Sequence, residues 1–211
     1  MVPGVLGEWS DPERVAEYLS REIPYRDIAE RMLLEALPEQ IECFLDLGTG
    51  DGRLLALLHE HYPRARGVGI DSSRPMLDRA AERFAGDPLI ALREHDLADM
   101  LTDLAPLDAV VSALTIHHLA DQRKRTLFSE IHALLTPGGV FVNLDLVASP
   151  TPDLHERFRQ AIGRAQDDPT DRLARLCEQL GWLRDAGFEQ TDCRFKWLEL
   201  ALMVAVRATD E

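Results

Sequence analysis

The stretch CFLDLGTGDG, which occupies residues 43–52, decides the fold of the chain. Its first five residues are almost all apolar, as is typical of a strand that is buried on both faces of a parallel sheet. Three glycines follow with the spacing G-x-G-x-G, and leucines at 54, 55, 57 and 58 then recur at helical spacing. A strand that runs through a glycine-rich turn into a helix predicts an α/β fold, with the turn at the sheet edge where such folds bind ligands.

The rest of the chain alternates short apolar runs with helical patterns, which is typical of a doubly wound sheet. Further strands are expected at 67–70, 89–92, 109–113 and 140–146. Two last apolar runs, 193–197 and 198–206, leave no room for a crossover helix and must pair as an antiparallel hairpin. The sequence therefore predicts a Rossmann-like α/β fold: a doubly wound seven-stranded sheet, mostly parallel with a C-terminal antiparallel hairpin, and helices on both faces.

Composition and charge restrict the partners and the location. The 211 residues carry 23 Lys and Arg against 37 Asp and Glu, so the net charge is −14. Such a surface repels phosphate groups, which argues against nucleic acid and anionic lipid as partners. No apolar run approaches the roughly 20 residues that a membrane span needs, and the first residues lack the pattern of a secretory signal. The expected location is cytoplasmic.

Asp71, at the end of the second expected strand, indicates the class of ligand. A carboxylate at this place can accept both hydroxyls of a ribose, although an acid here can also simply cap the next helix. The nicotinamide fingerprint G-x-G-x-x-G has its third glycine where this chain has Arg53, whose long side chain would hinder the approach of helix and strand. The observed spacing favours a nucleoside with an amino-acid tail and leaves a nicotinamide oxidoreductase as the disfavoured alternative.

Together these motifs resemble those of the class I S-adenosylmethionine (SAM)-dependent methyltransferases. The resemblance covers roughly residues 40–147 and 187–207. It is carried by LDLGTGDG at 45–52, GID at 69–71, DAVVSA at 108–113, HHL at 117–119, LTPGG at 135–139 and the closing hairpin. It implies a single domain over 1–211, divided into N-terminal helices (1–40), a SAM-binding core (41–147), a helical cover over the acceptor site (148–186) and the hairpin (187–207).

The resemblance also implies which residues contact SAM. The glycines of the turn wrap the methionine moiety, with one acid near its ammonium and one arginine near its carboxylate. A second acid binds the ribose, and residues after the third strand reach the adenine. The implied set is Arg26, Asp46, Gly48, Gly50, Gly52, Asp71, Ser72, Asp96, Leu97 and Ala113.

His117 and His118 are the candidates for a catalytic base or a contact to the acceptor, because they follow the fourth strand at the carboxyl edge of the sheet. A turn histidine bonded to backbone is the simpler interpretation of each. Adjacent histidines are poorly spaced for a shared metal ion, so no metal is assigned. Asp145, Trp182 and Trp197 are expected to contact the acceptor.

Methyl transfer from a sulfonium is an in-line displacement that asks the protein mainly to align donor and acceptor within about 3–3.5 Å and to exclude water. The acidic chain, without room for a second recognition domain, predicts a small-molecule acceptor and a possible homodimer. Two alternatives remain open. One is a SAM-modifying enzyme of the carboxy-SAM synthase type, which needs an arginine for the added carboxylate; the other is a noncatalytic SAM-binding subunit.

Overall fold

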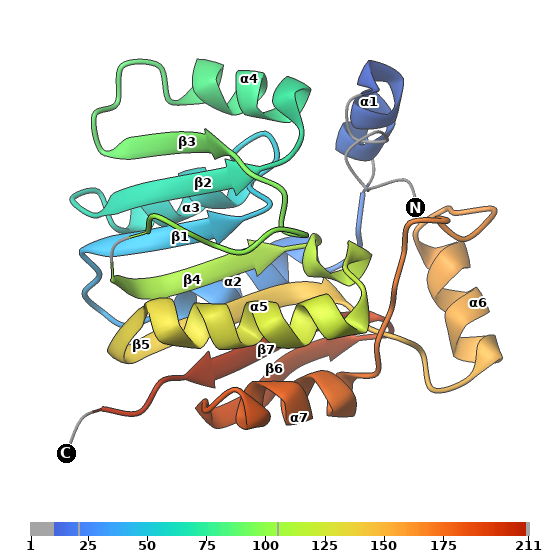
Figure 1. The fold of residues 1–211 in the computed structure, drawn as a ribbon. Coiled ribbons are helices and arrows are strands. Elements are labelled where there is room, and N and C mark those ends of the chain that lie inside the picture. Colours follow the sequence, from blue (N-terminus) through green and yellow to red (C-terminus); the bar gives the residue numbers. More distant parts are fainter. Residues whose placement is uncertain (1–10, 21, 105, 210–211) are drawn as a thin grey trace.

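A seven-stranded sheet forms the centre of the protein (Figure 1). The structure is a computed structural model that describes residues 11–20, 22–104 and 106–209. The strand order is β3-β2-β1-β4-β5-β7-β6. The strands are β1 (Cys43–Leu47), β2 (Arg66–Asp71), β3 (Ile90–Glu94), β4 (Leu107–Ala113), β5 (Leu135–Leu146), β6 (Glu189–Trp197) and β7 (Leu200–Val206).

Strands β1 to β5 are parallel, and β7 pairs antiparallel with both β5 and β6. From β1 the chain moves outward through β2 to β3 on one side, and it then returns to start the other half of the sheet at β4. This reversal makes the gap between β1 and β4 the switch point, where the carboxyl ends of parallel strands leave a crevice for a ligand. The predicted fold class is confirmed.

Helices cover both faces of the sheet (Figure 1). Helices α2 and α3 pack on one face, α5 and α7 pack on the other, and α4 runs along β2 and β3. In Figure 1, α1 and α6 stand beyond the carboxyl ends of the parallel strands. The helices are α1 (Pro12–Ser20), α2 (Arg26–Glu35), α3 (Arg53–His61), α4 (Arg74–Arg83), the 3-10 helix η2 (Ile116–His118), α5 (Asp121–Leu134), α6 (Pro152–Ala161) and α7 (Leu176–Asp185).

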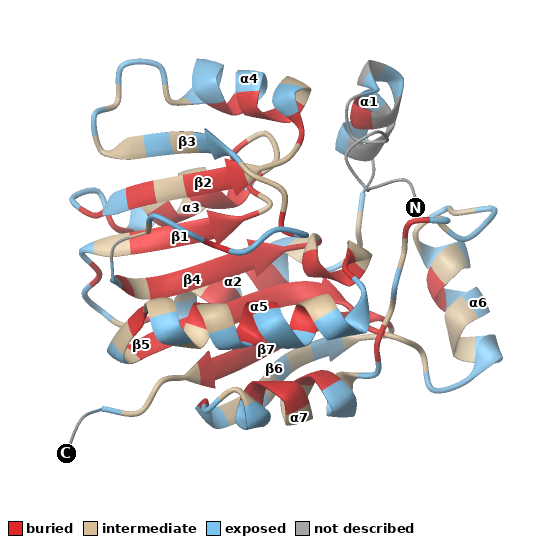
Figure 2. Cartoon of the chain, in the orientation of Figure 1, coloured by how far each residue is buried: buried red, intermediate tan, exposed pale blue. Residues whose placement is uncertain are grey.

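Two apolar layers make the core, one on each side of the sheet. Because side chains alternate along a strand, Phe44 enters the layer under α2 and α3 while its neighbour Leu45 enters the layer under α5 and α7. Both side chains are fully buried. Figure 2 shows the same pattern, with buried residues along the central strands and exposed residues on the outer sides of the helices.

The structure corrects two expectations about helices. The sequence predicts that the helix before the fifth strand stops at Pro137, but α5 ends at Leu134 and β5 begins at once, because Leu135 already pairs with Leu107 of β4. The helical cover expected over 148–186 is also only partly present. Helix α6 stands at the carboxyl edge of the sheet, whereas α7 packs against α5, β6 and β7.

No helix within the described ranges is both long enough and apolar enough to cross a membrane.

A substitution at Phe128 tests how closely the apolar layer beneath α5 is packed. The side chain of Phe128 is fully buried, with its ring centroid 5.7 Å from that of Phe141. We expect Phe128→Ala to lower the free energy of unfolding by about 3–5 kcal/mol, because the lost contacts leave a cavity. Met100→Ala is the control, since that side chain is 66% exposed and its truncation should change stability by at most about 0.5 kcal/mol. Urea unfolding followed by circular dichroism measures both, and equal losses would contradict the described packing.

Candidate functional site

The turn after β1 is held in a shape that only glycine suits. Gly48 has a φ of +69°, and the amides of Gly48 and Thr49 both donate to the carbonyl of Ile70, at 2.8 and 2.9 Å. A Cβ placed on Gly48 would lie 2.2 Å from the side chain of Thr115, which follows β4. The missing side chain therefore lets the ends of β1 and β4 approach each other at the switch point.

Asp71, at the end of β2, joins the turn to α4. Its Oδ2 accepts a hydrogen bond from the amide of Gly50 at 2.8 Å, and its Oδ1 accepts one from the amide of Ser73 at 2.7 Å. Ser73 in turn caps α4. Burial raises the pKa of Asp71 above its ordinary value, although these amide donors oppose the shift. The carboxylate thus shapes the loop, and each oxygen retains a second lone pair for a ligand.

A cavity of about 660 Å³, counted with its open mouth, lies beside Asp71. We call it the Asp71 cavity. It brings together six residues that the sequence predicts for cofactor binding, drawn from the turns after β1, β2 and β3. These are Gly48, Gly50, Asp71, Ser72, Asp96 and Leu97.

A second and broader cavity, the Asp46 cavity, opens on the other side of the glycine turn, and its walls include the predicted residues Arg26, Asp46 and Ala113. Asp46 is 1% exposed. Its Oδ2 accepts a hydrogen bond from the hydroxyl of Thr49 at 2.7 Å, but its Oδ1 accepts none from the described residues. Burial raises the pKa of Asp46 to about 7. The site therefore offers a buried acid with an unmet acceptor, which suits a cationic ligand group.

A buried carboxylate fixes Arg26 at the wall of this cavity. Glu30, which is 3% exposed, accepts from Nε of Arg26 at 2.7 Å and from Nη2 of Arg53 at 2.7 Å. Arg53 also pairs with Asp27, and its pKa is raised, mainly by the hydrogen bond to Glu30. Arg53, which replaces the third glycine of a nicotinamide motif, thus ties α3 to α2.

A third cavity of about 570 Å³, again with its mouth, lies beyond the end of β4, and we call it the His117 pocket. Leu114 and His118 line both this pocket and the Asp71 cavity, and Arg26 lines both this pocket and the Asp46 cavity. The three cavities therefore meet around the switch point. The pocket walls are Glu22, Ile23, Arg26, Leu114, His117, His118, Leu146, Phe158, Ile162, Arg164 and Asp168.

His117 is held from behind by Asp145. Its Nδ1 lies 2.5 Å from Oδ1 of Asp145, and the two side chains are 5% and 1% exposed. An ionised carboxylate can only accept, so Nδ1 of the ring carries a proton, and Nε2 keeps its lone pair in the neutral imidazole. Burial lowers the pKa of His117, but Asp145 and Asp171 outweigh it and the pKa is raised. Asp145, expected to contact the acceptor, lies behind His117 and outside the pocket wall.

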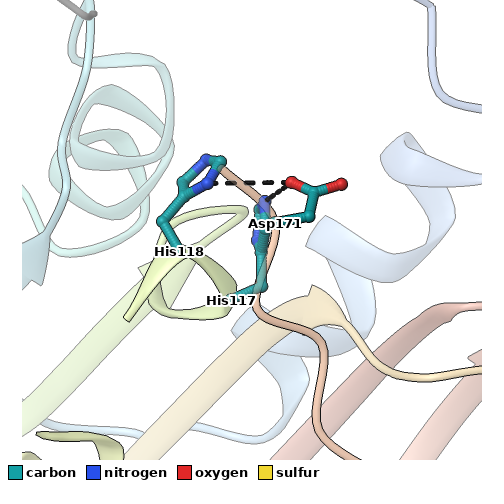
Figure 3. A group of neighbouring side chains, drawn as sticks. All are labelled: His117, His118 and Asp171. Atoms are coloured by element: carbon teal, nitrogen blue, oxygen red, sulfur yellow. Dashed lines mark ion pairs between the residues drawn. The ribbon is translucent and has the colours of Figure 1, made fainter. Parts of the chain in front are cut away.

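The two histidines meet a carboxylate from a distant part of the chain. Figure 3 shows Asp171, from the loop between α6 and α7, directed toward both imidazole rings. Its Oδ1 lies 3.5 Å from Nε2 of His117 and 3.7 Å from Nδ1 of His118. Burial raises the pKa of Asp171, against the influence of His117 and Arg164. The sequence assigns no metal here, yet the structure assembles a group of metal-ligating atoms that all lie within 4.8 Å of one another.

Gly52 and Trp182 lie outside the three cavities. A Cβ on Gly52 would lie 2.7 Å from Cε2 of Phe84, so this glycine permits the contact between the turn and α4. Trp182 of α7 is 7% exposed beneath the sheet, with the guanidinium of Arg125 at 4.6 Å over its ring. The apolar side of α7 turns this ring into the core, and the expected contact of Trp182 with the acceptor stays a prediction.

Trp197 stands one layer behind the His117 pocket. Its ring centroid lies 5.1 Å from that of Tyr25 and 6.0 Å from that of Phe158, and Phe158 itself lines the pocket. Trp197 lines none of the three cavities but borders a separate surface cavity with Arg157 and Lys196, and its expected contact with the acceptor stays a prediction.

Sequence reasoning missed several residues that line the cavities. His95 and Thr115 reach the Asp71 cavity from loops after β3 and β4, where only their position next to a predicted strand end could have indicated them. Ile162, Arg164 and Asp168 reach the His117 pocket from the loop after α6, which has neither a motif nor a periodic pattern.

Comparisons with known proteins agree with this geometry. The profile of a family described as a methyltransferase domain matches residues 44–139. An uncharacterized methyltransferase of Geobacillus kaustophilus is 30% identical over 154 residues, which are 72% of this chain and 70% of that protein. The structure of an O-methyltransferase family protein from Burkholderia thailandensis has a TM-score of 0.73 at 18% identity, over 96% of this chain and 62% of that one. At 18% identity, this likeness shows a shared fold alone.

Two further relatives match different lengths. An uncharacterized methyltransferase of Mycobacterium tuberculosis is 41% identical over 126 residues, which are 58% of either chain, so this chain covers less than two thirds of that relative. A carboxy-S-adenosyl-L-methionine synthase of Desulforapulum autotrophicum is 27% identical over 220 residues, which are 91% of this chain and 87% of the relative.

The close approach at Gly48 can be tested by a double-mutant cycle. We expect Gly48→Ala to lower the free energy of unfolding by more than Gly50→Ala, because a Cβ at Gly50 would have only Cε of Met76 near it, at 4.0 Å. Gly50→Ala should show only the strain of a positive φ, about 1–2 kcal/mol. Thr115→Gly in the Gly48→Ala background should recover the steric part of the loss. Two additive losses in chemical unfolding would show that no clash exists.

Proposed function

The chain belongs to the class I SAM-dependent methyltransferases, and we propose that it transfers the methyl group of SAM to a small-molecule acceptor bound in the His117 pocket. SAM is the cofactor of this family. Its sulfonium supplies both the methyl group and the leaving group, so the residues of the chain have to bind, orient and shield the two reactants.

In our proposal, each part of SAM contacts a different wall of these cavities. Asp71 receives the ribose hydroxyls, and Asp96 and Leu97 receive the adenine. The methionine moiety enters the Asp46 cavity, with its ammonium at Asp46 and its carboxylate at Arg26. The free Oδ1 of Asp46 supports this direction, because a buried acceptor without a partner is stabilised by an ammonium group.

The proximity of the three cavities is the observation that carries the proposal. Leu114 and His118 line both the His117 pocket and the Asp71 cavity, and Arg26 lines both the pocket and the Asp46 cavity. An acceptor in this pocket would therefore lie next to the proposed position of the sulfonium. Apolar side chains such as Phe158 and Leu146 exclude water from it, and the histidines contact the acceptor.

The same cavities support a one-domain organisation with a small acceptor. In our proposal, residues 22–26 and the segment from α6 to Asp168 cover the pocket above the core at 41–147. The net charge of −14 disfavours a nucleic-acid acceptor, and a surface position for the pocket leaves a homodimer possible.

A SAM-modifying reaction of the carboxy-SAM synthase type is the second candidate. The Desulforapulum relative with that name matches most of the chain. In addition, Arg164 lines the His117 pocket, where a guanidinium could hold a carboxylate added to SAM. Mass spectrometry of the small molecules released on denaturation separates the candidates. SAM or S-adenosylhomocysteine supports methyl transfer, and a SAM derivative about 44 mass units heavier supports the second reaction.

Asp71→Ala tests the ribose assignment. We expect SAM affinity to fall by about 1.5–3 kcal/mol, roughly 10- to 150-fold, because the ribose loses a charged hydrogen-bond acceptor and the glycine turn loses its anchor. Asp78→Ala is the control, because this acid is exposed on α4 and pairs with Arg74. Isothermal titration calorimetry measures both variants. An unchanged affinity in Asp71→Ala would remove the ribose from this position.

The pKa of Asp46, about 7, predicts how SAM affinity depends on pH. The ionised carboxylate is the form that binds an ammonium, so below pH 7 a proton must leave before SAM binds. We therefore expect affinity to fall about tenfold for each pH unit below 7 and to level off above it. Asp46→Asn should bind more weakly at neutral pH and lose this dependence.

Calorimetry in buffers with different ionisation enthalpies measures independently how many protons are released when SAM binds. The wild type should release up to one proton per SAM bound near pH 6, and Asp46→Asn should release less. A wild-type affinity that is flat between about pH 5.5 and pH 7 would contradict the ammonium assignment.

A further inference from the structure

The group at the end of β4 has the dimensions of a metal site. Two ligand atoms bound at about 2.0–2.2 Å to one ion lie about 3–3.5 Å apart. The Oδ1 of Asp171 lies 3.5 Å from Nε2 of His117 and 3.7 Å from Nδ1 of His118 (Figure 3). The third pair, the two imidazole nitrogens, lies within 4.8 Å, so the side chains would have to move closer together to bind one ion.

His117 is already oriented as a metal ligand. Its Nδ1 donates to Asp145 at 2.5 Å, which leaves the lone pair of Nε2 facing Asp171. A carboxylate behind the non-coordinating nitrogen is the usual partner of a metal-bound histidine, because it fixes the ring and raises its basicity. Both side chains are at least 95% buried, so solvent does not loosen this arrangement.

Asp171 presents one oxygen that nothing else in the described chain uses. Its Oδ2 accepts from Nη1 of Arg164 at 3.1 Å, and this contact orients the carboxylate. Its Oδ1 is buried and accepts no hydrogen bond from the described residues. A buried acceptor without a donor is costly, and a bound cation would satisfy it.

The net negative charge around the two imidazoles also favours a bound cation. Asp168 and Asp171 both pair with the guanidinium of Arg164, whereas Asp145 pairs with His117. With neutral imidazoles these groups carry two net negative charges in a largely buried place. A divalent ion would balance them.

Thr170 contacts the nitrogen of His118 that faces Asp171. Its hydroxyl donates to Oδ1 of Asp168 at 2.7 Å and also lies 3.1 Å from Nδ1 of His118. Since the single hydroxyl proton goes to Asp168, His118 must be the donor in the second contact. Moving that proton from Nδ1 to Nε2 would free the lone pair of Nδ1 for a metal.

We propose that Nε2 of His117, Nδ1 of His118 and Oδ1 of Asp171 bind one divalent transition-metal ion at the wall of the His117 pocket. Two imidazoles and one carboxylate favour Fe²⁺, Zn²⁺, Co²⁺ or Mn²⁺ over Mg²⁺ and Ca²⁺, which prefer oxygen ligands. Three protein ligands leave coordination positions open. A role in catalysis rests on the proposed function: the ion would bind an acceptor oxygen and lower the pKa of its hydroxyl.

Cobalt titration of the full chain, stripped with a chelator and free of any affinity tag, tests the site. We expect saturable visible absorption from one Co²⁺ per chain, displaced by Zn²⁺. His118→Ala and Asp171→Asn should abolish this saturable signal. Asp145→Asn should weaken binding by about 10- to 100-fold, since it removes the partner of a ligand.

His155→Ala is the matched control. His155 also contacts two acids, with Nδ1 at 2.7 Å from Glu199 and Nε2 at 2.8 Å from Asp167, but it belongs to no group of three ligands in the described chain. Its substitution should leave cobalt binding unchanged. Thermal unfolding of each variant identifies a loss of binding that reflects a loss of fold, and the isosteric Asp171→Asn is the variant expected to keep the fold.

X-ray absorption spectroscopy of the zinc-loaded protein tests the site a second time, because it measures which atoms bind the zinc and at what distance. Two imidazole nitrogens at about 2.0–2.1 Å would support the site. The proposal is overturned if no saturable cobalt signal appears, or if the signal survives both His118→Ala and Asp171→Asn. Protons on the two histidines would then neutralise the carboxylates instead. Because no step of the titration uses SAM, its failure would leave the assignment of SAM to the other two cavities intact.

Discussion

At the carboxyl ends of β1 and β4, the side chain of Thr115 packs so closely on the backbone of Gly48 that no Cβ fits at position 48. A Cβ on Gly48 would lie 2.2 Å from Thr115. This contact closes the floor of the switch point and places the glycine turn between the Asp71 and Asp46 cavities. The His117 pocket opens from the same place, because η2 begins one residue after Thr115. Each cavity therefore depends on the absence of one side chain.

Features with a local signal could be predicted from the sequence. The first strand was expected at 43–47 and is β1 at Cys43–Leu47. An apolar run that ends in glycines identifies such a strand by itself, because the signal does not depend on contacts with the rest of the chain. Gly48, Gly50, Asp71 and Asp96, at or after the ends of β1, β2 and β3, line the Asp71 cavity for the same reason. In parallel strands, position at a strand end is enough to place a residue at the shared edge.

Contacts between distant segments had no such signal. Alternation along β5 puts Asn143 and Asp145 on one face, but it does not say that this face turns away from the pocket and that Asp145 meets His117. Asp171 is 54 positions after His117 in a loop without periodicity, so the group of three ligands could not be anticipated. Trp182 lies in the core and outside the three cavities, and its sequence context could not indicate this, because a tryptophan in a helix packs in the core as readily as it contacts a ligand.

Three of the buried acids, Asp46, Asp145 and Asp171, each have one oxygen that accepts no hydrogen bond from the described residues. Asp46 lines one cavity, and Asp145 and Asp171 flank His117 beside another. An unsatisfied buried acceptor costs about 1–3 kcal/mol, so a chain shaped for stability alone would have apolar residues or donors there. Bound cations would remove this cost. An ammonium at Asp46 and a metal ion at Asp171 therefore follow from one principle: the folded chain leaves negative charge unmet where its ligands bind.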